Sequence, residues 1–154
     1  MTGKADFAAE EWQTVLEGPP SAGLVVATAQ RGGTFRESMS IGKAYVEARR
    51  QHGESQLLDE IVHERPELEH KRYRSLDELK THTLQNVREA VPLLEQKAAP
   101  GEVEDYKQFV LELAEKVASA HREGLLGLSG ERVNDAERQA MQEVAEALGA
   151  EAPA

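Results

Sequence analysis

Apolar residues recur every three or four positions along most of this chain, the spacing that places side chains on one face of an α-helix. The clearest example is near the C-terminal end of the sequence, where one stripe contains Ala140, Met141, Val144, Ala145 and Leu148. Asn134 and Glu137 form a capping box that begins this helix, and Gly149 ends it, because glycine readily adopts the left-handed backbone found at helix ends. The pattern therefore predicts a helix over residues 134–148.

A second amphipathic helix is predicted to begin at Pro100. Proline suits a first helical turn, and Glu102 lies near the positive end of the helix dipole. The apolar stripe that follows contains Tyr106, Val110, Leu113, Val117 and Ala120. Residues 124–130 are rich in glycine but have neither the dinucleotide-binding nor the P-loop spacing, so they are interpreted as a turn between the last two helices.

The N-terminal part of the chain predicts two helices separated by prolines. Residues 7–17 have Trp12 on the apolar side, and the Gly-Pro-Pro sequence at 18–20 is expected to end this helix because proline lacks a backbone N–H. Residues 21–30 are small and apolar, which predicts a largely buried second helix.

The middle of the chain predicts three further helices, over residues 34–51, 57–62 and from 75 onward. The first of them is expected to bury Phe35, Met39, Tyr45 and Val46. Gly42 lies inside it and is expected to allow a neighbouring helix to approach closely. No alternating strand pattern appears, so we predict an all-α fold, a compact bundle of about seven helices. Residues 1–150 are expected to form one domain and residues 151–154 a frayed tail.

Composition narrows the classes of function. The 154 residues contain no cysteine, which excludes thiolate ligands and a cysteine nucleophile. The net charge of −10 disfavours binding to nucleic acid or to anionic membranes. No apolar leader and no apolar run of about 20 residues is present, so a cytoplasmic protein without a membrane span is expected.

Potential metal ligands are densest at His63, Glu67 and His70. A zincin carries two histidines four residues apart on one helix. Here the second histidine lies seven residues after the first, and Pro66 is expected to break the helix between them. A charged surface loop is the alternative interpretation. A metal-dependent or small-molecule-processing enzyme would use these groups, or His121, in a pocket between helices.

One basic cluster, Lys71, Arg72 and Arg74, stands out in this acidic chain, and Arg49-Arg50 is a second basic pair. Such a cluster either pairs with the chain's own carboxylates or docks an acidic partner. Homo-oligomerisation is a further expectation, since short amphipathic helices can leave apolar faces uncovered.

Two stretches, residues 7–26 and 124–149, resemble a group of uncharacterised bacterial proteins. From Tyr106 onward the chain also resembles the TerB-like helical domain associated with tellurite resistance. That resemblance implies an all-α bundle, a cytoplasmic location and a non-enzymatic, stress-linked role with a link to metals. TerB-like domains often carry Asp-Gly before the last capped helix, where this chain has Ser129-Gly130, which weakens the transfer of metal binding.

The sequence thus favours a non-enzymatic helical protein that acts through protein or ligand contacts, without a cofactor. The alternatives are the His/Glu enzyme and a partner-binding module that uses the basic cluster at residues 71–74.

Overall fold

The structure is a computed structural model that describes residues 2–28, 34–50, 56–64, 76–124 and 135–149; the side chains of residues 27–28, 34–40, 76–77, 119–124 and 135–137 lie outside this description. The described residues form a 3-10 turn and six α-helices without a strand: η1 (Lys4–Asp6), α1 (Ala9–Thr28), α2 (Thr34–Arg50), α3 (Gln56–His63), α4 (Leu76–Lys97), α5 (Pro100–Gly124) and α6 (Asp135–Leu148). The predicted all-α fold is confirmed, with six helices in place of seven.

The count differs because the two predicted N-terminal helices are one. Helix α1 continues through Pro19 and Pro20, so the expected end after residue 17, at the Gly-Pro-Pro sequence, is wrong. Pro19 has no N–H to donate to the carbonyl of Val15 one turn earlier. The hydroxyl of Tyr106, on α5, donates to that carbonyl instead, at 2.8 Å. Gly18 leaves room for it, since a Cβ there would lie 2.1 Å from the Tyr106 oxygen.

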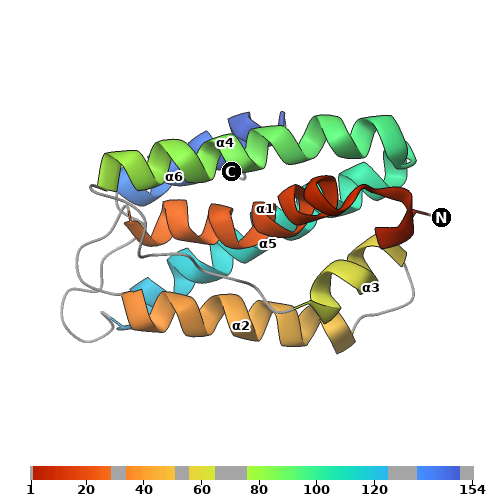
Figure 1. Ribbon diagram of the computed structural model, residues 1–154. Coiled ribbons are helices and arrows are strands. Elements are labelled where there is room, and N and C mark those ends of the chain that lie inside the picture. Colours follow the sequence, from red (N-terminus) through yellow and green to blue (C-terminus); the bar gives the residue numbers. More distant parts are fainter. Residues whose placement is uncertain (1, 29–33, 51–55, 65–75, 125–134, 150–154) are drawn as a thin grey trace.

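The helices lie in three layers, with α1 and α5 in the middle (Figure 1). Helices α4 and α6 cover one side of this central pair, and α2 and α3 cover the other. Helix α1 packs mainly against α4 and α5, and its residues 18–26 are all buried. Burial on both sides explains why this segment consists mainly of small and apolar residues.

Contacts around α2 correct two expectations. Gly42 has no atom of the described residues within 4 Å of an added Cβ, so no helix side chain in this part of the chain approaches it closely. Gly23 of α1 does this instead, because a Cβ there would lie 2.7 Å from Ile41 Cδ1. Tyr45 is buried as predicted, but Val46 is 44% exposed, so its predicted burial is wrong.

The start of α1 is fixed by its own first turn. The Ala8 amide donates to the Glu11 carboxylate at 2.8 Å, which is one half of a capping box. Phe7 packs on Trp12 with ring centroids 5.6 Å apart, a hydrophobic staple across the helix start. The helix therefore begins at Ala9, two residues later than predicted.

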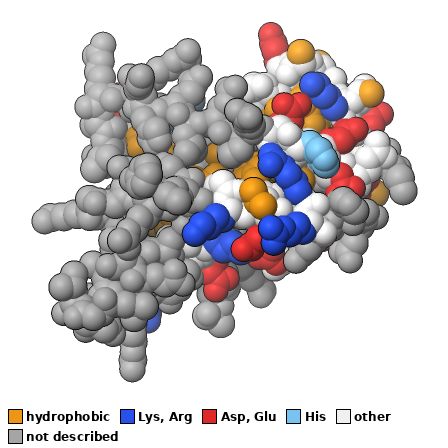
Figure 2. Space-filling view, turned by 90° about the horizontal axis from the view of Figure 1, so that it is seen from below, with side chains coloured by type: hydrophobic (Ala, Val, Ile, Leu, Met, Phe, Trp, Pro, Cys, Tyr) orange, Lys and Arg blue, Asp and Glu red, His pale blue; other side chains and the backbone are white. Residues whose placement is uncertain are grey.

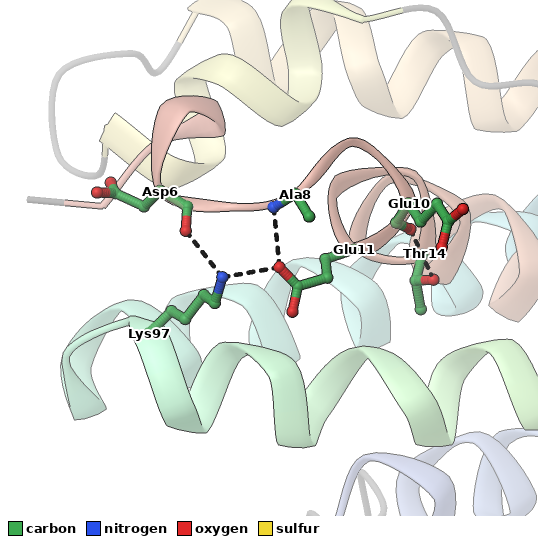
Figure 3. Close-up of polar contacts among 6 residues, drawn as sticks. All are labelled: Asp6, Ala8, Glu10, Glu11, Thr14 and Lys97. Carbon is green, nitrogen blue, oxygen red and sulfur yellow. Dashed lines mark hydrogen bonds and ion pairs between the residues drawn. The ribbon is translucent and has the colours of Figure 1, made fainter.

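The N-terminal segment is also tied to the end of α4 (Figure 3). The Lys97 ammonium donates to the Asp6 carbonyl at 3.0 Å and to Glu11 Oε1 at 2.7 Å. Thr2 is held in turn by Glu102, whose carboxylate accepts from the Thr2 hydroxyl at 2.8 Å and from its amide at 3.0 Å. These contacts hold the N-terminal segment against the end of α4 and the start of α5.

Candidate functional site

Of the three predicted metal ligands, His63 is described, whereas Glu67 and His70 lie outside the described residues. His63 is exposed at the end of α3, and its Nδ1 lies within hydrogen-bond distance of the Asp59 carbonyl. Within the described ranges, no three His, Asp or Glu side chains are grouped so that they could hold a metal ion. The side chain of His121 also lies outside the description.

His63 borders a hollow of about 340 Å³ between the N-terminus, α1 and α3. The charged groups of this hollow largely contact one another, because Lys4 pairs with Glu64 at 3.4 Å and its amide donates to Glu60. Trp12 also lines the hollow, and its indole N–H is buried without a hydrogen-bond partner in the described part of the chain. The hollow is therefore built mainly by contacts that hold the N-terminal segment.

The predicted basic cluster, Lys71, Arg72 and Arg74, lies outside the described residues. The second basic pair is described. Arg49 is half-buried, and its Nε donates to the Val62 carbonyl in the last turn of α3. Arg50 is exposed beside it. Arg49 thus serves partly as a C-terminal cap for α3, whose last carbonyls lack partners within the helix.

A groove of about 220 Å³ lies where α2, α3 and α5 meet, and the sequence alone did not indicate it. We call it the acidic groove. Helix α5 contributes one face at helical spacing, and α2 and α3 contribute shorter faces; the lining residues are Ala44, Glu47, Ala48, Leu58, Asp59, Val62, Asp105, Gln108, Phe109, Glu112, Leu113 and Lys116.

The floor of the acidic groove is apolar and firmly packed. Val62 and Leu113 are each 1% exposed, and Phe109 makes an edge-on contact with Tyr45 of α2 at 5.5 Å between ring centroids. Burial raises the pKa of Tyr45 far above its ordinary value, against a smaller lowering by Arg49, so its hydroxyl stays neutral. The floor is thus a preformed hydrophobic surface without an ionised group.

The rim of the acidic groove carries four carboxylates and one ammonium group: Glu47, Asp59, Asp105, Glu112 and Lys116. Lys116 forms an ion pair with Glu47 across α5 and α2. The hydrogen bond from Lys116 and its positive charge lower the pKa of Glu47, so this carboxylate is ionised at neutral pH. The rim therefore has an excess of negative charge over a hydrophobic floor.

The outer side of α2 has the opposite charge. Lys43, Val46 and Arg50 follow one another at three- and four-residue steps, and all three are exposed. We call these three residues the basic face. Figure 2, which views the molecule from the side of α2 and α3, shows several Lys and Arg side chains with Asp and Glu side chains between them. Glu47 borders both the acidic groove and the hollow along the basic face, so the two surfaces adjoin on one helix.

The described part of the chain is thus a bundle of six packed helices with a groove between α2, α3 and α5. None of the described helices is both long and apolar enough to cross a bilayer. In comparisons with known proteins, the chain matches no family model, no curated protein and no solved structure.

Proposed function

We propose that this protein is a non-enzymatic helical binding module whose acidic groove holds a basic segment of a protein chain. The observation that carries the proposal is the combination of an apolar floor with a rim on which four carboxylates outnumber one ammonium group. Lysine and arginine side chains fit such a surface, because their methylene stems cover apolar area while the charged ends reach the rim.

The size of the groove favours side chains of a protein over a free small molecule. Its volume of about 220 Å³ lies below the roughly 300–1,000 Å³ usual for pockets that bind small molecules. Two or three anchoring side chains fill such a space, while the rest of the partner lies across the exposed helices. The excess of carboxylates on the rim also attracts the cations of such a segment at close range.

A role in a stress response related to tellurite resistance belongs to this proposal and is supported by the resemblance of the chain from Tyr106 onward to TerB-like domains. The alternative of an enzyme that uses His63, Glu67, His70 or His121 stays a prediction, which elemental analysis of the purified protein and substrate screening would test. The alternative docking site at residues 71–74 also stays a prediction.

The binding proposal is tested with a labelled amphipathic helical peptide that carries leucine and arginine on one face. We expect fluorescence anisotropy to give a dissociation constant of about 1–100 µM at moderate salt. The double variant Asp105→Lys/Glu112→Lys should weaken this binding about tenfold or more, because each reversal replaces an attraction by a repulsion.

The matched control is Glu95→Lys/Glu115→Lys, which changes the net charge equally at exposed positions outside the groove. We expect it to weaken binding only slightly, through the longer-range field. Equal losses in both double variants would contradict the proposal, as would the absence of peptide binding when the protein is monomeric.

A further inference from the structure

The basic face is an unusual feature of a chain with 28 acidic and 18 basic residues. Lys43 and Arg50 lie two helical turns apart, with Val46 between them on the same side of α2. Val46 is the large hydrophobic side chain that stands out as exposed among the described residues, at 44%. The hollow along this face also contains Glu47 and Arg49, so its charge is positive on balance and complements the negative rim of the acidic groove.

From this complementarity we infer that the occupant of the acidic groove is the basic face of a second copy of this chain. The inference rests on the proposed function, because it names the partner of the same groove. Val46 supplies the apolar contact for the groove floor, and Lys43 and Arg50 supply the cations for rim carboxylates such as Asp105 and Glu112.

The position of the two surfaces on α2 determines the symmetry of such a pair. They lie on neighbouring sides of the helix and adjoin at Glu47. A two-fold axis parallel to α2 places two copies of the helix side by side, so that each basic face meets the groove of the other copy. Both contacts then form at once and the assembly closes as a dimer, because the two-fold axis repeats each contact.

The test uses two charge-reversal variants at exposed positions, where the fold should tolerate them. Lys43→Glu/Arg50→Glu reverses the basic face, and Asp105→Lys/Glu112→Lys reverses the rim of the groove. We expect the wild type to sediment at twice 17.0 kDa at about 0.1 M salt and at concentrations of about 100 µM. Each variant alone should sediment as a monomer.

An equimolar mixture of the two variants supplies the decisive result. In Lys43→Glu/Arg50→Glu both the altered face and the groove are acidic, and in Asp105→Lys/Glu112→Lys both the face and the altered groove are basic. Each face therefore attracts the groove of the other variant, and we expect a heterodimer. The control Glu95→Lys/Glu115→Lys should remain a homodimer. A wild type that stays monomeric, a dimer that persists in both variants, or a mixture that stays monomeric would each overturn the inference.

Failure of the inference is separable from failure of the binding proposal. The variant Lys43→Glu/Arg50→Glu retains an unaltered groove rim at Asp105 and Glu112, and it should bind the arginine peptide. Peptide binding together with a monomeric wild type rejects the second copy as occupant and retains the groove. Loss of peptide binding in this variant rejects both.

Discussion

Replacing Tyr106 by phenylalanine tests how α1 continues past Pro19. The Tyr106 hydroxyl donates to the Val15 carbonyl at 2.8 Å, and both residues are fully buried. Pro19 cannot make the bond that this carbonyl would accept in an ordinary helix. Tyr106→Phe therefore removes a hydrogen bond from a carbonyl that neither solvent nor the backbone nitrogen of residue 19 can satisfy.

The expected cost is the desolvation penalty of one buried acceptor, about 1–3 kcal/mol. For a chain of this length, each kcal/mol corresponds to a fall in Tm of roughly 2–4 °C. In a Pro19→Ala background the backbone amide gained at position 19 can donate to Val15, so we expect Tyr106→Phe to cost about 1–2 kcal/mol less there. The double-mutant cycle cancels the unrelated effects of removing proline.

Urea unfolding followed by far-UV circular dichroism measures all four free energies of unfolding. Thr83→Val is the matched control, because the Thr83 hydroxyl also donates to the carbonyl four residues earlier, at 2.8 Å. That carbonyl lies inside α4 and already accepts the Thr83 amide in regular helical geometry, so the control should cost about 0.5 kcal/mol or less. An equal cost of Tyr106→Phe in both backgrounds would refute the reasoning.

Two other perturbations follow from the same packing and polar contacts. Gly23→Ala should lower the free energy of unfolding by about 1–3 kcal/mol, because the added methyl group would lie 2.7 Å from Ile41. Gly42→Ala, with no described neighbour within 4 Å, should raise the free energy of unfolding by up to about 1 kcal/mol. Urea unfolding of both variants measures these changes. Burial raises the pKa of Glu102, but hydrogen bonds from Thr2 and from the Ala99 amide lower it more, so the folded pKa lies below the ordinary 4.5. The stabilisation by Glu102 should be complete above about pH 4.5 and disappear as the pH falls through the lowered pKa, so wild type and Glu102→Gln should converge in unfolding free energy at low pH; a constant difference would contradict this.

Local spacing was sufficient to predict most of the helices. The start of α4, the start of α5 at Pro100 and the end of α6 agree with the sequence pattern, and Gly149 has the positive φ of 69° expected at a helix end. These features depend on residues within one or two turns of each other. Their interactions can therefore be read without knowledge of the tertiary fold.

The error at residues 18–20 has a tertiary cause. The group that satisfies the Val15 carbonyl is Tyr106, 91 residues away in the sequence. The rule that proline ends a helix correctly accounts for the hydrogen bond that Pro19 removes. It does not include a hydroxyl from a distant part of the sequence that replaces this bond. The missing Cβ of Gly18, read locally as part of a helix end, in fact makes space for that hydroxyl.

The acidic groove could not be predicted for a related reason. Its α5 face was present in the sequence as polar positions beside the apolar stripe, at 105, 108, 112 and 116. That pattern does not show that α2 and α3 leave this face of α5 partly uncovered. Val46 shows the same limit from the other side, because an apolar residue at helical spacing was predicted to be buried but lies on the surface.

The arrangement of charge on α2 also sets the conditions under which self-association is measured. Two copies with a net charge of −10 each repel one another at long range, while the basic face and the acidic groove attract only near contact. The Debye length is about 30 Å at 0.01 M salt and about 10 Å at 0.1 M, so moderate salt suppresses the repulsion while close pairs still interact. At about 1 M the length falls to about 3 Å and the pairs are screened as well. Attraction through this interface is therefore strongest at intermediate ionic strength, whereas a purely hydrophobic contact would strengthen steadily as salt is added.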